Sequence, residues 1–154
     1  MKNIGYCSTP IGDIAIVEED GAISQVFFCA DPTVLGQIAE TDLIKKAAEQ
    51  LDEYFKGRRK AFDLPLAPQG TPFQQSVWNA LLKIKFGETR SYKEIAEQIG
   101  NPKAVRAVGM ANNRNPISII IPCHRVIGSD GSLVGYGGGL SIKQYLLELE
   151  RCYD

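Results

Sequence analysis

A stretch with three prolines and one glycine divides the chain into two parts of different pattern. It runs from Leu64 to Pro72 and shows neither helical nor alternating periodicity. Proline breaks helices and cannot donate to a sheet ladder, so no helix or central strand can pass through this stretch. We therefore predict a linker here. The 154 residues then form two domains, residues 1–66 and residues 67–154.

The residues before the linker have the pattern of a small α/β domain. Apolar side chains alternate or cluster at residues 4–8, 11–18 and 21–29, with turn residues between these runs. This pattern predicts an antiparallel meander. Apolar residues then recur at helical spacing over residues 43–55, and Gly57 is placed to end that helix. The first domain contains no catalytic motif.

Helix signals dominate after the linker, and two of the predicted helices are adjacent. Ser91 and Glu94 match a capping box, which predicts a short helix over residues 92–99 with a glycine behind it. Asn101, as N-cap before a proline, predicts that a second helix begins at once and runs through Ala111. Two short helices around a tight turn indicate a helix-turn-helix, whose second helix commonly enters a DNA groove. An ordinary packed helix pair fits the same pattern.

Two longer helices are predicted on either side of this pair. Thr71 as N-cap and Pro72 at the first helical position begin a helix whose apolar stripe extends to Ile84. Ser141 with Gln144 is expected to cap the last helix. The residues of that helix expected to pack inward are Ile142, Tyr145, Leu146 and Leu149.

The most reactive side chains follow a short apolar run. Ile119 to Ile121 are β-branched and predict a buried strand, which Pro122 ends. Cys123 and His124 come next, so a nucleophile and a base are neighbours in the sequence. Neighbours on a strand point to opposite faces, and a water between the two side chains would then link them. A cysteine after an apolar run also fits a small buried hydrophobe.

Composition limits the classes of function. With 44% apolar residues, 23% charged residues and a net charge of -1, the chain is expected to fold as an ordinary globular protein. This balance argues against broad attraction to nucleic acid but allows a local basic face. The N-terminus lacks the apolar core of a signal peptide, and no run is long enough to cross a bilayer, so we expect an intracellular protein.

The four cysteines do not form a recognisable framework. Cys7, Cys29, Cys123 and Cys152 have scattered spacings, and inside a cell they are expected to be thiols rather than disulfides. No Cys-x-x-Cys pair exists and His124 is the only histidine, so we predict no zinc site and no other cofactor.

Together these motifs resemble the O6-alkylguanine-DNA alkyltransferases, also called methylated-DNA-protein-cysteine methyltransferases. The resemblance extends from about Pro72 to Arg151. It implies a ribonuclease H-like first domain, with a small antiparallel sheet and a helix. It also implies a mainly helical, winged-helix-like second domain. The motifs that carry it are Pro122-Cys123-His124-Arg125-Val126, Asn115-Pro116, Ser91-Tyr92, Asn101-Pro102, Arg106-Ala107-Val108-Gly109 and Tyr136-Gly137-Gly138-Gly139.

The resemblance implies a role for each reactive side chain. Cys123 would take the alkyl group from O6-alkylguanine in DNA, and by extension from O4-alkylthymine, and keep it, so that each molecule acts once. His124 would draw off the thiol proton through a water, and Glu150 would orient the imidazole. Tyr92 would donate a proton to the leaving base, and Asn115 would hold the site and its turn.

The resemblance also implies how DNA is bound. The second helix would enter the minor groove of double-stranded DNA with the damaged base flipped out, and Arg106 would fill the resulting gap. Further DNA contacts would come from Lys103, Arg114, Ser91 and Ala107, and the base pocket would include Tyr136, Gly137 and Gly138. It implies a monomer without membrane association, located in the cytoplasm, or in the nucleus if the source is a eukaryote.

Two departures from the family pattern bear on these expectations. Some relatives hold zinc in the first domain through two cysteines and two histidines; Cys7 and Cys29 offer thiols here, but no histidine remains. Gly137 stands where some relatives carry a hydroxyl-bearing residue near the bound base. Three alternatives to alkyl transfer stay open at this point: a non-enzymatic damage sensor, a helix-turn-helix regulator with a buried thiol, and a cysteine hydrolase.

Overall fold

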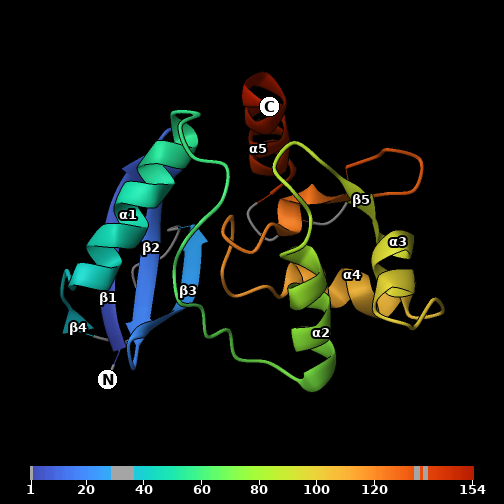
Figure 1. The fold of residues 1–154 in the computed structure, drawn as a ribbon, viewed down its shortest axis with the longest axis horizontal. Helices are drawn as coiled ribbons and strands as arrows, with labels where there is room; N and C mark the ends of the chain where they lie inside the picture. The colour runs from blue at the N-terminus through green and yellow to red at the C-terminus, as the bar shows by residue number, and fades with distance from the viewer. Residues whose placement is uncertain (1, 29–36, 134–135, 137–138) are drawn as a thin grey trace. The chain divides into compact units, whose positions relative to one another are not determined.

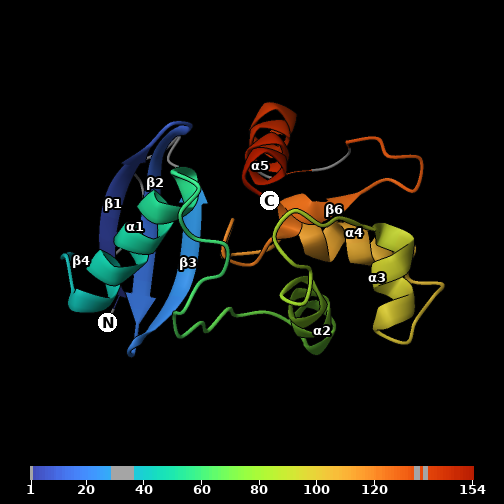
Figure 2. The same ribbon diagram turned by 45° about the horizontal axis from the view of Figure 1, so that its top comes forward.

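The structure is a computed structural model that describes residues 2–28, 37–133, 136 and 139–154. It divides into two compact units. Unit 1 comprises the described residues up to Pro68 together with Pro116–Ile120, and unit 2 comprises Gln69–Asn115 and Ile121–Asp154. Sequence reasoning did not anticipate that residues 116–120 belong to the first unit. The elements of each unit can be followed in Figure 1 and, from a second direction, in Figure 2.

Unit 1 is a four-stranded sheet with one helix against it. β1 (Lys2–Thr9), β2 (Gly12–Glu19) and β3 (Ala22–Phe28) form the predicted antiparallel meander. The short strand β4 (Gln37–Ile38) pairs parallel to β1, which gives the order β3-β2-β1-β4. α1 (Asp42–Phe55) packs against β1, β2 and β3.

The boundaries of α1 follow from local chemistry. The Thr41 side chain accepts a hydrogen bond from the backbone N–H of Ile44 at 3.2 Å and so caps the first turn. Gly57, with a φ of +73°, ends the helix in the left-handed conformation, as predicted. The buried face of the helix consists of Ile44, Ala47, Gln50, Leu51, Tyr54 and Phe55.

The segment 116–120 extends β3 rather than forming the predicted strand. Val26 donates to the carbonyl of Pro116 at 2.9 Å and accepts from the N–H of Ser118 at 2.9 Å. The backbone then turns, because Ile119 has a φ of +71° and the N–H of Ile120 bonds to the Ser118 carbonyl at 2.8 Å. This three-residue turn is a strained conformation for a β-branched residue. The strand predicted over residues 119–121 is therefore wrong, although its three side chains are buried.

Unit 2 is mainly helical, and the predicted helix-turn-helix is present as α3 and α4. α2 packs on both of these helices, and the indole N–H of Trp78 donates to the carbonyl of Ala111 at 2.9 Å. The elements of the unit are α2 (Pro72–Leu81), β5 (Arg90–Ser91), α3 (Tyr92–Gln98), α4 (Val105–Asn113), the 3-10 turn η1 (Cys123–Arg125), β6 (Val126–Ile127) and α5 (Leu140–Tyr153). β5 and β6 pair in parallel.

Capping chemistry sets most of the helix starts in unit 2. The predicted N-caps Thr71 and Ser91 both form complete capping boxes. The predicted N-cap at Asn101 is wrong: α4 begins only at Val105, without a side-chain cap. The carbonyl of Asn101 accepts from the N–H of Ala104 at 3.0 Å, so residues 101–104 form a turn of their own.

The last helix also begins differently from the prediction. Gly139, with a φ of +99°, is the N-cap of α5, and Ser141 lies inside the first turn without capping it. Tyr145 was expected to pack inward but is 38% exposed, whereas Lys143 is fully buried. Within the described residues, none of the helices is both long and apolar enough to span a membrane.

Candidate active site

The side chains of the candidate site come from four elements of unit 2. Pro122 precedes the 3-10 turn, whose hydrogen bond from the N–H of Arg125 to the Pro122 carbonyl is 3.0 Å long. This turn, and not a strand, carries Cys123 and His124. The other contributors are Tyr92 at the start of α3, Asn112 near the end of α4, Asn115 two residues after that helix, and Lys143 and Glu150 on α5.

The Cys123 thiol is buried, with 4% of the residue exposed, and forms no disulfide. Burial raises the pKa of this thiol. Hydrogen bonds from the side chains of Asn115 and Tyr136 and the positive charge of Lys143 act in the opposite direction without cancelling that rise. The resting form at neutral pH is therefore the thiol, and a reaction at sulfur needs a group that takes its proton.

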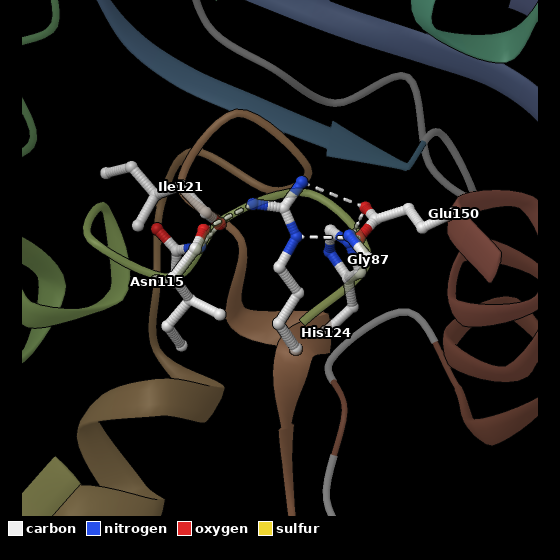
Figure 3. Close-up of polar contacts among 7 residues, drawn as sticks. Gly87, Asn115, Ile121, His124 and Glu150 are labelled. Atoms are coloured by element: carbon white, nitrogen blue, oxygen red, sulfur yellow. Dashed lines mark hydrogen bonds and ion pairs between the residues drawn. The ribbon is translucent and has the colours of Figure 1, made fainter. Parts of the chain in front are cut away.

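His124 is the nearest base in the sequence, and it is held by a carboxylate. Its Nε2 donates to Oε2 of Glu150 at 2.5 Å, and Figure 3 shows the ring and the carboxylate joined in this way. Because an ionised carboxylate only accepts, Nε2 is the protonated ring nitrogen. Nδ1 has no hydrogen-bond partner among the described residues. Burial lowers the pKa of His124 against the pull of Glu150, so the ring is neutral at rest and can accept a proton at Nδ1.

Glu150 is the most densely bonded group of the site. Besides His124 it accepts from Nε and a terminal nitrogen of Arg125, at 2.7 and 3.0 Å, and from the N–H of Gly87 at 3.3 Å. Burial alone would raise its pKa, but His124 and then Arg125 outweigh burial and lower that pKa to about 2. The carboxylate is ionised over the whole neutral range.

Asn115 braces the backbone that leads into the turn. Its Nδ2 donates to the carbonyl of Ile121 at 2.8 Å, and both residues are labelled in Figure 3. The hydrogen bond fixes the peptide two residues before Cys123, and the same side chain bonds the sulfur. The resemblance implied that Asn115 holds the site and its turn, and this hydrogen bond is the contact that would do so.

Sequence reasoning did not predict two buried polar residues of this site, Lys143 and Asn112. Nζ of Lys143 donates to the Val126 carbonyl at 2.5 Å and lies 5.8 Å from the centre of the Tyr92 ring. Burial lowers the pKa of Lys143 to about 8. Asn112 donates to the Cys123 carbonyl at 3.3 Å and also bonds the Tyr92 side chain. Lys143 stands seven residues before Glu150, two helical turns away on the same face, which is the signal that would have found it.

Four of the five predicted DNA-contacting residues lie on α4 or directly beside it in the chain. Arg106 and Ala107 are exposed on α4, Lys103 is exposed in the turn before it, and Arg114 is exposed just after it. Ser91 is half-buried because its hydroxyl caps α3. A shallow hollow beside α4 is lined by Thr71, Phe73, Gln74, Ala107, Met110, Ala111 and Arg114.

The glycine-rich loop is described only in part. Tyr136 is half-buried, and burial raises its pKa well above the ordinary value. Gly137 and Gly138, predicted to line a base pocket, lie outside the described residues, as does Cys29. Among the residues with described positions, no three His, Cys, Asp or Glu side chains are grouped to hold a metal ion.

These features define a class of protein: a two-unit protein in which a helix-turn-helix unit encloses a buried cysteine next to a histidine that is held by a carboxylate. Residues 72–152 match the family model of the 6-O-methylguanine DNA methyltransferase DNA binding domain, and residues 4–68 match that of its ribonuclease-like domain. The chain belongs to the 6-O-methylguanine DNA methyltransferase family.

Individual relatives agree along nearly the full length of the chain. It is 51% identical to a methylated-DNA--protein-cysteine methyltransferase of Methanosarcina acetivorans, with 92% of this chain and 94% of the relative covered. It is 48% identical to the constitutive enzyme of that name from Bacillus subtilis, with 98% and 96% covered. Among solved structures, Mycobacterium tuberculosis OGT in complex with DNA is 45% identical, with a TM-score of 0.92 over 98% of this chain and 94% of that one.

Proposed function

We propose that this protein repairs DNA by moving the alkyl group of O6-alkylguanine, and of O4-alkylthymine, onto the sulfur of Cys123. The observation that carries the proposal is the buried Cys123 thiol beside a neutral His124 that is bonded to Glu150, within the unit that holds the helix-turn-helix. The family match and the methyltransferase names of the relatives support the same reaction.

The proposed reaction is a single displacement at the alkyl carbon. The thiol proton passes to Nδ1 of His124 through a bridging water, and the sulfur attacks the alkyl carbon. The C–S bond forms as the bond from that carbon to O6 breaks, and the bonding electrons stay on guanine. The guanine then takes one proton, so the products are the thioether of Cys123 and ordinary guanine.

Neighbouring groups have supporting roles in this scheme. Glu150 stabilises the imidazolium that forms on His124, as a carboxylate does for a histidine base. Tyr92 donates its phenolic proton toward the departing base. Lys143 lies near the Tyr92 ring, so its positive charge offsets the negative charge left on the phenolate. Asn115 holds the turn that presents the sulfur. Tyr136, Gly137 and Gly138 form the proposed pocket for the flipped base.

The DNA-binding part of the proposal uses the exposed side of α4. This helix would lie in the minor groove of the duplex, as the family resemblance implies. The nucleotide would be flipped out, because a target atom inside the stack is reached only in that way. Arg106 would occupy the gap, and Lys103 and Arg114 would contact phosphates. Ser91 and Ala107 would form the close backbone contacts. The DNA complex of the Mycobacterium tuberculosis relative supports DNA as the partner class.

The protein would act once per molecule. A thioether is a poor leaving group, and the described part of the site offers no second thiol to displace it. We further propose that residues 67–154, apart from the segment 116–120 that belongs to unit 1, carry both DNA binding and transfer, with residues 1–66 as a separate domain. The protein would act as a monomer without a cofactor, in the cytoplasm or, in a eukaryote, the nucleus.

Intact mass measurement tests this function directly. The protein is mixed with duplex DNA that contains O6-methylguanine, and its mass is expected to rise by one methyl group. The Cys123→Ser variant should show no gain. A repeated loss of O6-methylguanine without a change in protein mass would indicate a hydrolase instead. DNA binding with no loss of the methyl group would indicate a sensor or a regulator.

A further inference from the structure

Arg125 is a buried cation next to the proposed relay of Cys123, His124 and Glu150. The residue is 6% exposed, although arginine is almost never buried without a partner. Its guanidinium grips both oxygens of Glu150, at 2.7 and 3.0 Å, and its remaining terminal nitrogen donates to the carbonyl of Ile84 at 2.7 Å. The guanidinium carbon Cζ also lies 5.8 Å from the centre of the Phe86 ring.

This arrangement fixes the guanidinium from every direction. A two-point contact with a carboxylate sets both distance and orientation, which a lysine in the same place could not do. The backbone contact at Ile84 ties the pair to the turn that follows α2, and the ring contact limits tilting. The carboxylate of Glu150 therefore has one orientation, and in that orientation one oxygen faces Nε2 of His124.

The charge of Arg125 matters as much as its geometry. A lone carboxylate in contact with a buried imidazole would pull a proton onto the ring and form a standing ion pair. Here the carboxylate is already neutralised by the guanidinium, and the positive charge of Arg125 lowers the pKa of His124. A ring that is already protonated cannot take the thiol proton.

We propose that Arg125 is a positioning residue for alkyl transfer, whose guanidinium holds Glu150 immobile and ionised and so keeps His124 uncharged until the thiol proton arrives. This inference rests on the proposed function of Cys123. The charged or titratable groups that face His124 are Glu150 and Lys143 from α5, Arg125 from its own turn, and the neighbouring Cys123. Of these, only Arg125 binds the Glu150 carboxylate in two-point contact.

The single histidine of the chain makes the test direct. Ring nitrogen signals in the NMR spectrum of untagged protein can come only from His124, and their titration gives its pKa without DNA. In the wild-type protein at pH 7 we expect a neutral ring with its proton on Nε2. In Arg125→Met, which keeps an apolar chain against Phe86, we expect the pKa to rise by about one to three pH units. The transfer rate falls at low pH as His124 becomes protonated, and the midpoint of that fall should move to higher pH by the same amount.

Two further variants separate charge from geometry and from general damage. Arg125→Lys keeps the charge but not the two-point grip, so the titration should stay near that of the wild type while transfer slows. Arg59→Met removes a different arginine–carboxylate pair, the contact with Glu53 in unit 1, and should change neither quantity. A His124 ring that is doubly protonated at pH 7 in the wild-type protein would overturn the inference, even if Arg125→Met failed to fold.

The outcomes also distinguish this inference from the proposed function. If Arg125→Met leaves the His124 titration unchanged while the wild-type protein still gains a methyl group from DNA, alkyl transfer stands and the role of Arg125 is wrong. If the titration moves as expected but the wild-type protein gains no methyl group, the electrostatic arrangement is real and alkyl transfer is wrong.

Discussion

The buried Glu150 carboxylate accepts four hydrogen bonds from three residues, and its charge is what distinguishes it from an amide of the same shape. Glu150→Gln keeps the size of the side chain but removes the anion that would stabilise a protonated His124. We expect alkyl transfer to slow by about tenfold or more, which corresponds to at least one pKa unit of lost stabilisation. Single-turnover rates with O6-methylguanine DNA would measure this.

DNA affinity should hardly change in the same variant, because Glu150 is buried and is not among the exposed residues of α4. A titration of labelled duplex provides the control. Were affinity to fall as steeply as the rate, Glu150 would serve to hold α5 in place and would have no part in the proton transfer.

At the scale of single elements, α4 presents Arg106 from an exposed face, next to the small residue Ala107. If the guanidinium fills the gap left by a flipped nucleotide, Arg106→Ala should slow repair of duplex DNA far more than reaction with free O6-methylguanine. The comparison of the two rates is the measurement. Only the duplex reaction requires the base to be extruded.

A purely electrostatic role for Arg106 has a different signature. If the arginine only neutralised one phosphate, its loss would lower the affinity for all DNA sequences alike. The slope of log affinity against log salt concentration would fall by about one, and repair at saturating DNA would be near normal. Equal slowing on duplex and free base would contradict both readings and indicate a structural role in unit 2.

Short sequence motifs correctly predicted the helix ends that depend only on residues a few positions away. Thr71 and Ser91 cap their helices through side chains three residues away, so the sequence contains the whole interaction. Gly57 is likewise explained by its own left-handed backbone. For the same reason the helix-turn-helix and the helix of unit 1 were predicted correctly from spacing alone.

The errors arose where distant residues decide the local structure. Ile119 turns sharply because segment 116–120 is bound to β3, about ninety residues earlier in the chain. The error at Asn101 is an exception, because it is local: the Asn101 carbonyl closes a separate turn with Ala104 instead of beginning the helix. Lys143 was not predicted to be buried, because its partner is a distant backbone carbonyl and only its spacing of seven residues from Glu150 points to it.

The molecule as a whole should show the effect of the buried acid in its stability. Glu150 has a pKa of about 2 in the folded state, against an ordinary value of 4.5. A lowered pKa means that its contribution is complete above about pH 4.5 and is lost as the pH falls toward 2. We expect the loss to be roughly 3 kcal/mol in the free energy of unfolding.

Urea unfolding of the wild-type protein and of Glu150→Gln at several pH values would measure this contribution. The difference between the two proteins should be constant above pH 5 and should shrink at lower pH, because the variant has no carboxyl group to titrate. A difference that stays constant down to pH 2 would show that Glu150 has the same pKa in the folded and unfolded protein, and so that its partners do not hold it ionised.

The placement of residues 116–120 restricts how the gene can exchange its parts. These residues complete the sheet of unit 1, yet they are encoded about fifty codons beyond the linker at residues 64–72. Recombination in the linker would therefore join β3 from one parent to Ile117 from another. A hybrid would need matching sequences at both places, so the two units are expected to be inherited together rather than shuffled as independent modules.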